Sequence, residues 1–468
     1  MLILKVVFLQ FFWLAIVLFG ASINEILLIS WSIFIVGANF LIYKPVISIG
    51  RFFFVALLFT TFGYIHDSSL IWLKIILSES YSYGFLSLWI VFISYYGDVF
   101  NKLKELPLLF LAILGGIGGS LAYWSAYKLG ALSIALDSET FYLIFVFVLW
   151  GIFFPLSMWV FYEDKYWDFI LDKTIVFSFD KSGYKRHKSK FEGDLSQKDL
   201  TGKISLVTGG TSGIGGEVAQ ELSRLGSKII VTGRNEQKGR SFIENNLNLQ
   251  FQSLDMANWN RIKDFSNKGN CFDYIVLNAG GMPDSLVLND YSVEHQCASQ
   301  LIGHYYLIYM LKKYGKINRH ARIIWVSSGG MYLKKLDLDS LFRNQKYEKV
   351  STYSNVKRAQ VTLVEELSRQ ERWKNEQVFS MHPGWVGTYG LKEALPKFFS
   401  LMKNRLRNMK EGADTIIWLL LTEESLTSGS FYFDRKIVSP YISKNYNPTR
   451  EQRNALMNKI DNYIEKCP

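Results

Sequence analysis

The stretch Thr208-Gly209-Gly210-Thr211-Ser212-Gly213-Ile214-Gly215 follows directly on the apolar run 204–207. Residues 217–225 then carry apolar side chains at helical spacing. A strand that passes through a glycine-rich turn into a helix brings backbone N–H groups and the positive end of the helix dipole close to a pyrophosphate. The stretch therefore predicts a dinucleotide-binding α/β domain of the Rossmann type, built on a doubly wound parallel sheet.

Further apolar runs of strand length follow this turn, with helical patterns between them. They lie at 228–232, 247–254, 274–277, 322–326 and 378–381. Strands that alternate with helices build a parallel sheet with right-handed crossovers. We therefore expect the cofactor-binding domain over residues 203–440 and a C-terminal helical tail over 441–468.

The first 162 residues have another composition, because they are nearly all apolar and aromatic. A bilayer core requires about 20 apolar residues per helix. Runs of this kind lie near 3–21, 24–43, 51–66, 84–100, 107–128 and 141–162. They predict an α-helical transmembrane bundle of about six helices over 1–162, followed by a basic juxtamembrane linker over 163–202. The first run is interpreted as an anchor, since more apolar segments follow it at once.

The basic residues of the loops and of the linker fall mostly on one side of this six-helix arrangement. The positive-inside rule then predicts an integral membrane protein whose soluble domain faces the cytoplasm. If the source is bacterial, the membrane would be the inner or plasma membrane. The cysteines lack a Cys-x-x-Cys pattern, which fits a reducing compartment and no structural metal. Nucleic-acid binding is not expected, because no long basic tract interleaves with aromatic residues in the soluble half.

Three features of the apolar half and its linker need interpretation. Asp67 and Asp98 lie at or near the ends of expected spans, which favours solvated interface residues over a transport path. Gly115 and Gly119 form a small-xxx-small pair that favours close helix packing. The basic cluster of the linker either attracts anionic headgroups or acts only as an orientation signal. Its members are Lys181, Lys185, Arg186, His187, Lys188 and Lys190.

Two further motifs follow the glycine-rich turn in a fixed order. Ser327 and Ser328 come directly after the run 322–326, and Tyr353 lies four residues before Lys357. Positions i and i+4 share one face of a helix, so Tyr353 and Lys357 point at the same pocket. Residues 200–440 with these motifs resemble the short-chain dehydrogenase/reductase family, most closely its retinol-dehydrogenase-like branch. Residues 5–162 resemble a bacterial membrane-protein family of unassigned function, which implies no chemistry.

The family resemblance implies a catalytic set. Ser328 would hold the substrate oxygen, and Tyr353 would deliver a proton to it. A free phenol has a pKa of about 10, and a neighbouring ammonium group brings that pKa down toward the working pH. Lys357 would supply this charge and would also hold the nicotinamide ribose. Hydride transfer between a carbonyl and an alcohol is the reaction that such a set serves.

The resemblance also implies how the cofactor is bound. NAD-selective members carry an acidic residue at the end of the second strand, where this chain has Gly233 followed by Arg234. A guanidinium group suits a 2′-phosphate, so NADP is favoured over NAD. The expected cofactor contacts are Thr208, Gly209, Thr211, Ser212, Gly213, Ile214, Gly215, Arg234, Asp255, Asn278, Ala279, Gly280, Tyr353, Lys357, Pro383, Gly384, Val386 and Thr388.

Two residues and one stretch near the expected site are interpreted separately from the catalytic and cofactor-binding residues. Many family members place an asparagine in the helix before the catalytic strand, where it carries a water of a proton relay, and this chain has Gln300. His382 is expected to be structural. Residues 391–410 occupy the place of the substrate lid and mix apolar with basic side chains, so they either dip into the cytoplasmic leaflet or pack on their own domain.

The sequence thus predicts a membrane-anchored, NADP-dependent oxidoreductase that interconverts a carbonyl and an alcohol on a lipophilic small molecule. Its expected partners are this substrate and the lipid bilayer, and a homo-oligomer is left open. Two alternatives remain at this point. One is a non-catalytic NAD(P)-binding sensor, and the other is a regulatory domain attached to a membrane scaffold or transporter.

Overall fold

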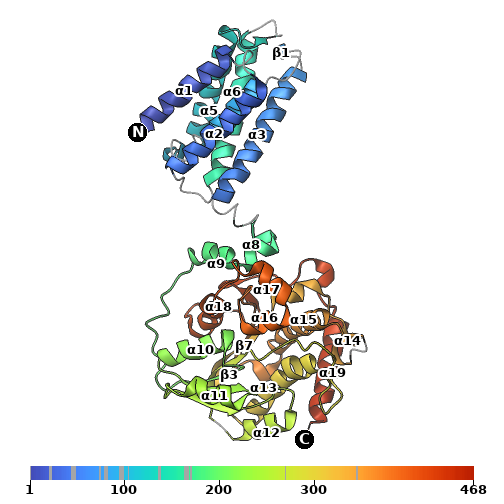
Figure 1. The fold of residues 1–468 in the computed structure, drawn as a ribbon. Helices are drawn as coiled ribbons and strands as arrows, with labels where there is room; N and C mark the ends of the chain where they lie inside the picture. Colours follow the sequence, from blue (N-terminus) through green and yellow to red (C-terminus); the bar gives the residue numbers. More distant parts are fainter. Residues whose placement is uncertain are drawn as a thin grey trace. The chain divides into compact units, whose positions relative to one another are not determined.

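The computed structural model describes residues 2–19, 24–43, 49–72, 75–77, 83–93, 100–103, 105–134, 139–162, 168, 171–268, 270–343 and 346–467. The chain divides into two compact units, Met1–Ile170 and Leu171–Pro468 (Figure 1).

The first unit is helical. Its described helices are α1 (Leu2–Phe19), α2 (Glu25–Tyr43), α3 (Ile49–Trp72), α4 (Tyr83–Phe92), α5 (Leu108–Lys128) and α6 (Glu139–Tyr162). Each overlaps one of the apolar runs. In the described part of the chain, two helices are long and apolar enough to cross a membrane, namely α5 and α6, and α1 and α2 contain shorter apolar segments. The structure thus shows a helical N-terminal domain. It does not confirm that all six helices span a membrane.

Close packing joins α5 and α6. A Cβ atom on Gly115 would lie 2.4 Å from Cβ of Phe154, and one on Gly119 would lie 2.2 Å from Cγ of Trp150. No side chain fits at either glycine without moving α6 away. Gly115 and Gly119 therefore lie on the contact between the two helices, as the small-xxx-small spacing predicts.

The expectation of a solvated Asp67 is wrong. Asp67 is 2% exposed and lies inside α3, which continues past the expected span. Its carboxylate accepts hydrogen bonds from Trp89 Nε1 at 2.7 Å and from the hydroxyl of Tyr123, and His66 Nδ1 lies 2.8 Å from it. These donors from α4 and α5 replace water around the charge, which is why a carboxylate is tolerated in an apolar interior. Asp98 lies outside the described residues.

The second unit contains an eight-stranded sheet in the order β10-β9-β8-β7-β6-β3-β4-β5. The strands from β3 to β9 pair in parallel, and only β10 is antiparallel. Their bounds are β3 (Ile204–Thr208), β4 (Lys228–Gly233), β5 (Leu249–Ser253), β6 (Phe272–Leu277), β7 (Ile317–Val326), β8 (Gln377–Met381), β9 (Phe431–Phe433) and β10 (Lys436–Ile437). The first six coincide with the expected strands, and the hairpin β9–β10 was not anticipated because its strands are only three and two residues long.

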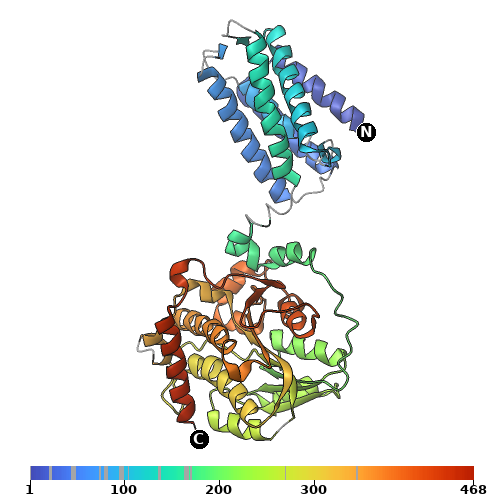
Figure 2. The same cartoon turned by 180° about the vertical axis from the view of Figure 1, so that it is seen from behind.

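Helices cover both faces of this sheet, as Figures 1 and 2 show. One apolar core includes residues of α10 (Gly213–Arg224), α11 (Glu236–Ile243) and α18 (Met409–Leu421). The other includes residues of α12 (Trp259–Asn267), α13 (His304–Lys313), α15 (Lys349–Leu367) and α19 (Arg450–Glu465). This three-layer arrangement is the doubly wound fold that the alternation of strands and helices predicts.

Both ends of the second unit pack on its body. In the C-terminal tail, α19 buries Leu456, Ile460 and Ile464 in the core of one sheet face, and Figure 2 shows it, in dark red, along the side of the unit. At the other end, two short helices, α8 (Ile175–Phe179) and α9 (Lys181–Lys188), precede the first strand. The structure thus places residues from Leu171 onward in this unit, within the segment expected to be a linker.

Candidate active site

The glycine-rich turn lies where the order of the sheet reverses, since β3 pairs with β4 on one side and with β6 on the other. Doubly wound sheets bind their ligands at this switch point. Gly209 has a left-handed φ of +63°, and a Cβ atom there would lie 2.8 Å from Cα of Ala279. A Cβ on Gly215 would lie 2.4 Å from Nδ2 of Asn278. Glycine is therefore required at both positions by the turn after β6.

The start of α10 has the features of a pyrophosphate site. The helix begins at Gly213 with φ +59°, and Ser212 at the N-cap makes no side-chain hydrogen bond to the N–H groups of the first turn. Around a Cβ built on Gly213, only Thr388 lies within 4 Å. Ile214 follows and packs partly against the sheet. Free N–H groups at a helix start and room above a glycine fit a dinucleotide phosphate.

Thr208 is fully buried, and its hydroxyl is turned into the protein. Its Oγ1 accepts hydrogen bonds from the N–H groups of Asn278 at 2.9 Å and Ala279 at 3.0 Å. The hydroxyl proton is left to donate to His304 Nε2 at 3.0 Å, and His304 Nδ1 then donates to the carbonyl of Gln300 at 3.0 Å. Burial and the charge of Lys357 lower the pKa of His304 to about 3, so this imidazole is neutral. Thr208 thus holds the Asn-Ala-Gly turn in place, and no sequence motif had indicated His304.

Cationic side chains gather beyond the end of β4. Arg234 is exposed there, and Lys238 on α11 donates to Ser212 Oγ at 2.9 Å. The charges of Asp255 and Arg234 both act on His295, so these side chains share one region. Thr211 lies beside Gly233, at 3.3 Å from the position of its missing Cβ. Lys238 does not belong to the cofactor contacts expected from the sequence.

The expected catalytic residues converge at the end of β7. Ser328 is the N-cap of a short 3-10 turn, where its Oγ accepts a hydrogen bond from Gly330 N at 3.1 Å. Tyr353 and Lys357 lie one turn apart on α15, and Lys357 Nζ is 5.4 Å from the centre of the Tyr353 ring. The ammonium group of Lys357 donates to the carbonyl of Val326 at 3.0 Å, and the Ser328 hydroxyl lies close enough to Tyr353 to act on its pKa. Residues about 30 positions apart in sequence therefore form one cluster.

The electrostatics of this cluster differ from the sequence expectation. Burial lowers the pKa of Lys357 to about 7, and no ion pair of Lys357 is found among the described residues. Burial raises the pKa of Tyr353, and the Ser328 hydroxyl opposes this rise only in part. The phenol is therefore protonated near neutral pH rather than brought down by Lys357. A buried amine and a buried phenol both resist charge in a low dielectric.

Comparisons with known proteins fit this geometry. The sequence pattern of the family described as short chain dehydrogenase matches residues 203–397. The human Dehydrogenase/reductase SDR family member 12 is 30% identical over 58% of this chain and 90% of its own length. Mouse Retinol dehydrogenase 11 is 27% identical over 51% of this chain and 80% of its own, and human Polyprenol dehydrogenase is 27% identical over 54% and 82%. The chain belongs to the short-chain dehydrogenase/reductase family.

A second family pattern matches residues 2–156 and is described as a protein of unknown function, DUF2878. The protein is thus a short-chain dehydrogenase/reductase domain joined to an N-terminal helical domain of that second family. As a short-chain dehydrogenase/reductase it is an oxidoreductase that uses NAD(P), and the glycine turn fits such a dinucleotide.

The Pro-Gly turn after β8 lies on a buried arginine. Gly384 has φ +75°, and a Cβ there would lie 2.4 Å from Nε of Arg407, so only glycine fits. The carbonyl of Pro383 accepts a hydrogen bond from Arg407 at 3.4 Å, and Val386 pairs with the backbone of the same arginine. Thr388 accepts a hydrogen bond from the first turn of α16 (Tyr389–Ala394) at 3.0 Å, which leaves its hydroxyl proton available to a carboxamide.

His382, before this turn, is 1% exposed and stacks on Phe433 with ring centres 4.1 Å apart. Burial and the charge of Arg407 lower the pKa of His382 to about 3, so its ring is neutral. The structural role expected of His382 agrees with this environment.

Gln300 lies in a π-helical turn, η4 (Cys297–Gly303), and is 1% exposed. Its Nε2 donates to the carbonyl of Gly281 at 2.7 Å, whereas its Oε1 is buried without a hydrogen-bond partner in the described residues. A Cβ on Gly280 would lie 2.8 Å from that oxygen. Single π turns occur often at functional sites, and an unsatisfied carbonyl oxygen suits a water or a ligand donor.

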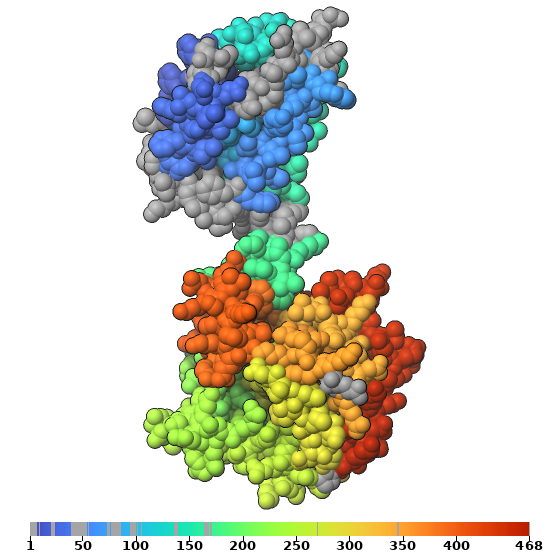
Figure 3. All heavy atoms as spheres, turned by 45° about the vertical axis from the view of Figure 1, so that its right-hand side comes forward, coloured from blue at the N-terminus to red at the C-terminus, as the bar shows by residue number. Residues whose placement is uncertain are grey.

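The lid region consists of α16 and α17 (Pro396–Met402), which are orange in Figure 3 and lie beside α8. Phe398 packs its ring edge on Trp385 at 5.1 Å, and Leu401 is 82% exposed. Arg407 belongs to the basic residues of the expected lid stretch 391–410, and it is 1% exposed. It is buried because carbonyl groups and Asp434 surround its guanidinium group.

Proposed function

We propose that this short-chain dehydrogenase/reductase is a membrane-anchored, NADP-dependent enzyme that interconverts a carbonyl and an alcohol on a lipophilic substrate. The observation that carries the proposal is the convergence of Ser328, Tyr353 and Lys357 beside the glycine turn. A bound nicotinamide dinucleotide supplies the hydride in this reaction. The protein supplies the proton, the orientation and the electrostatic stabilisation.

Each residue of the cluster has a separate task in this proposal. Ser328 holds the substrate oxygen by a hydrogen bond. Tyr353, protonated near neutral pH, donates its proton as negative charge develops on that oxygen. Lys357 then stabilises the phenolate with its ammonium group, which lies over the Tyr353 ring. The orientation of the substrate toward the cofactor rests on Ser328 and on the Pro-Gly turn.

The preference for NADP rests on Arg234 and Lys238, which place two cations beyond the end of β4. Two cations stabilise the 2′-phosphate, and an NAD-type carboxylate is absent from the position that Gly233 occupies. Fluorescence titration of the full-length protein in detergent with NADPH and NADH tests this preference. We expect tighter NADPH binding that is lost in Arg234→Asp and retained in the control Arg240→Asp, a neighbouring exposed cation on α11. Equal binding of both cofactors by the wild type would refute the preference.

Membrane attachment is supported by the surface of the helical unit. On α5 and α6, large apolar side chains stand exposed, among them Leu109 at 70%, Phe110 at 60% and Ile152 at 63%. Burying such surface in lipid is favourable, whereas leaving it in water is not. We expect the protein to stay in the membrane fraction after alkaline carbonate extraction, and to reduce dodecanal better than butanal. The names of the relatives, retinol and polyprenol dehydrogenases, motivate the lipophilic substrate.

The cytoplasmic orientation of the second unit remains part of the proposal. It predicts that Cys271, which is exposed on the second unit, is labelled by a membrane-impermeant maleimide only after the membrane is opened. Labelling in intact cells whose outer face alone is accessible would reverse the assigned orientation.

A further inference from the structure

The segment before the first strand of the sheet is firmly held. Asp180, between α8 and α9, is 1% exposed and caps α9 by accepting hydrogen bonds from Ser182 N at 2.9 Å and Gly183 N at 3.1 Å. Its other oxygen accepts two hydrogen bonds from Arg405, at 2.8 and 2.5 Å. The segment is therefore joined to the end of the expected lid stretch, after α17.

A buried arginine binds the backbone of the same segment. Arg407 donates to the carbonyls of Ser178 and Phe179, each at 3.0 Å, and pairs with both oxygens of Asp434 at 2.5 and 2.8 Å. Two-pronged pairing of this kind fixes orientation as well as distance. The guanidinium group thus ties the end of α8 to the hairpin β9–β10.

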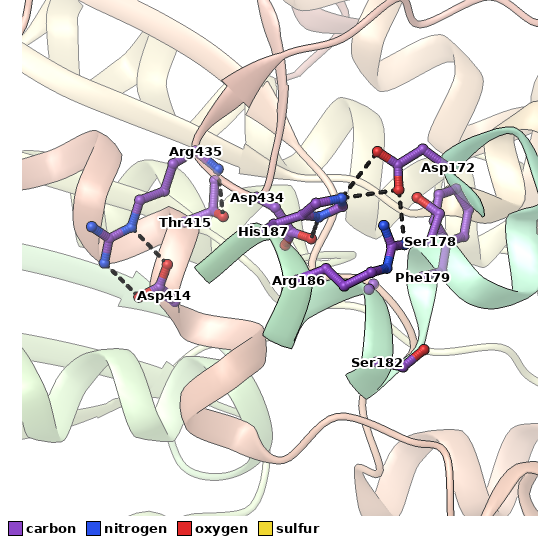
Figure 4. A network of polar contacts seen from close by, with 12 residues as sticks. Asp172, Ser178, Phe179, Ser182, Arg186, His187, Asp414, Thr415, Asp434 and Arg435 are labelled. Atoms are coloured by element: carbon purple, nitrogen blue, oxygen red, sulfur yellow. Dashed lines mark hydrogen bonds and ion pairs between the residues drawn. The ribbon is translucent and has the colours of Figure 1, made fainter. Parts of the chain in front are cut away.

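The turn of that hairpin makes a second contact with the segment, between Asp434 and His187 (Figure 4). Asp434 and Arg435 both have left-handed φ values, 45° and 60°, which a two-residue hairpin turn requires. Asp434 Oδ2 lies 2.6 Å from His187 Nδ1, and the other ring nitrogen of His187 lies 3.0 Å from Asp172. We call Asp180, His187, Arg405, Arg407 and Asp434 the anchor.

What the anchor holds in place is Phe179. The Phe179 ring lies 4.4 Å from that of His382 and 6.0 Å from that of Trp385, measured between ring centres. A Cβ atom on Gly329, the residue after Ser328, would lie 2.5 Å from this ring. The carbonyl of Phe179 accepts a hydrogen bond from Trp385 N at 2.8 Å. Phe179 therefore fills the space between the loop that follows Ser328 and the Pro-Gly turn.

We infer that Phe179 is a positioning residue of the active site, contributed by the segment that follows the helical domain and locked there by the anchor. The inference rests on the proposed function and names a part of its site that lies outside the family's own pattern. That pattern covers residues 203–397, whereas Phe179 and the whole anchor lie before or after it. Phe179 acts through the two loops: it keeps Ser328 at the substrate oxygen and the Pro-Gly turn at the cofactor.

The test compares Phe179→Ala with Phe191→Ala in the full-length protein in detergent. Phe191 belongs to the same segment but packs on Tyr184 and Arg435, away from Ser328. Hydrogen–deuterium exchange is followed with and without NADPH. In Phe179→Ala we expect exchange at 328–333 and 383–388 to rise about tenfold, because the packing that opposes local opening is lost. Exchange in β3 and β4 should stay as in the wild type.

Turnover of dodecanal gives the second readout. We expect kcat of Phe179→Ala to fall by about tenfold to a hundredfold, as a loosely held reacting group implies. The Kd of NADPH should rise in Phe179→Ala, because the loosened Pro-Gly turn belongs to the expected cofactor contacts. Phe179→Tyr should restore kcat, and Phe191→Ala should match the wild type in both quantities.

The proposed function and the role of Phe179 can fail independently of each other. A wild type that binds no NADPH and reduces no aldehyde contradicts the proposed function, and the exchange of the two loops without cofactor still decides the role of Phe179. Equal loop exchange in Phe179→Ala and Phe191→Ala would overturn the inference. So would a rise in exchange throughout the sheet, because Phe179 would then support the fold in general.

Discussion

Two buried cations of the second unit have opposite surroundings. Lys357, in the candidate active site, is 3% exposed and donates to one carbonyl, and burial lowers its pKa to about 7. Arg407, in the anchor, is 1% exposed and is paired with both oxygens of Asp434, which in turn contacts His187. In the described residues, the charge of Lys357 has no carboxylate partner, whereas the charge of Arg407 is compensated by Asp434.

The difference separates a reactive group from a structural one. An amine that is buried without a counter-charge holds its proton weakly and changes charge near neutral pH, as acid–base chemistry requires. A guanidinium group in an ion pair keeps its charge and its geometry. Substitutions at the two places should therefore change stability in opposite directions: loss of the Lys357 charge should stabilise the fold while lowering activity, whereas loss of an anchor charge should destabilise the fold.

The largest effect is expected from Lys357→Met. Loss of the ammonium group should lower kcat for aldehyde reduction by about 10²- to 10⁴-fold, the range typical of a lost acid–base contribution. The melting temperature should rise at pH 6, since the folded state no longer has to protonate a buried amine; each tenfold change in proton affinity corresponds to about 1.4 kcal/mol. Stopped assays and differential scanning fluorimetry measure both. A fall in both activity and melting temperature would contradict the comparison.

Asp434→Asn is expected to have the next largest effect, and on stability. Asparagine tolerates the left-handed φ of this turn, so the change removes mainly the charge and leaves Arg407 buried without its partner. Breaking a buried ion pair in this way costs about 3–5 kcal/mol. The matched control is Asp414→Asn, whose partner Arg435 is more exposed, and a smaller loss is expected. Chemical denaturation of the two variants gives the free energies, and equal losses would contradict the special role of the anchor.

The pH dependence of the reaction should follow Lys357. Because its pKa lies at about 7, the ammonium group is lost above that pH, and kcat/KM for aldehyde reduction should fall about tenfold per pH unit there. Anchor variants that still fold should keep the same profile. A flat profile between pH 6 and 9 would show that Lys357 stays charged in the working enzyme.

The smallest effect is expected from His187→Gln, and it concerns stability at different pH values. Burial lowers the pKa of His187, but hydrogen bonds and charges from Asp172 and Asp434 outweigh it and raise the pKa above its ordinary value. The stabilisation by His187 is therefore fully present below the unfolded pKa of about 6.5 and is lost as the pH rises through the raised folded pKa. The difference in melting temperature between wild type and His187→Gln should be larger at pH 6 than at pH 9. A difference that grows toward pH 9 would contradict this sign.

Local patterns determined much of this protein from its sequence alone. Strand runs, helix periodicity, the glycine turn after β3 and the Tyr353–Lys357 spacing all depend on neighbours a few residues apart, so the sequence displays them directly. The family followed from the order of these motifs, and the expected strands coincide with β3 to β8. The turn glycines are required by contacts within the same crevice.

Only the tertiary structure decided which charges are buried and with whom. His187 and Asp434 are 247 residues apart, and Arg407 and Phe179 are 228 apart. No periodicity links such positions, because they meet only when the hairpin β9–β10 closes on the segment before the sheet. For the same reason Asp67 was expected to be an interface residue, although α4 and α5 supply its donors. His187 was likewise expected only as a member of the basic cluster of the linker, although Asp434 and Asp172 bind its ring. The free energy of a buried charge depends on partners that the fold brings together, and the sequence does not show them.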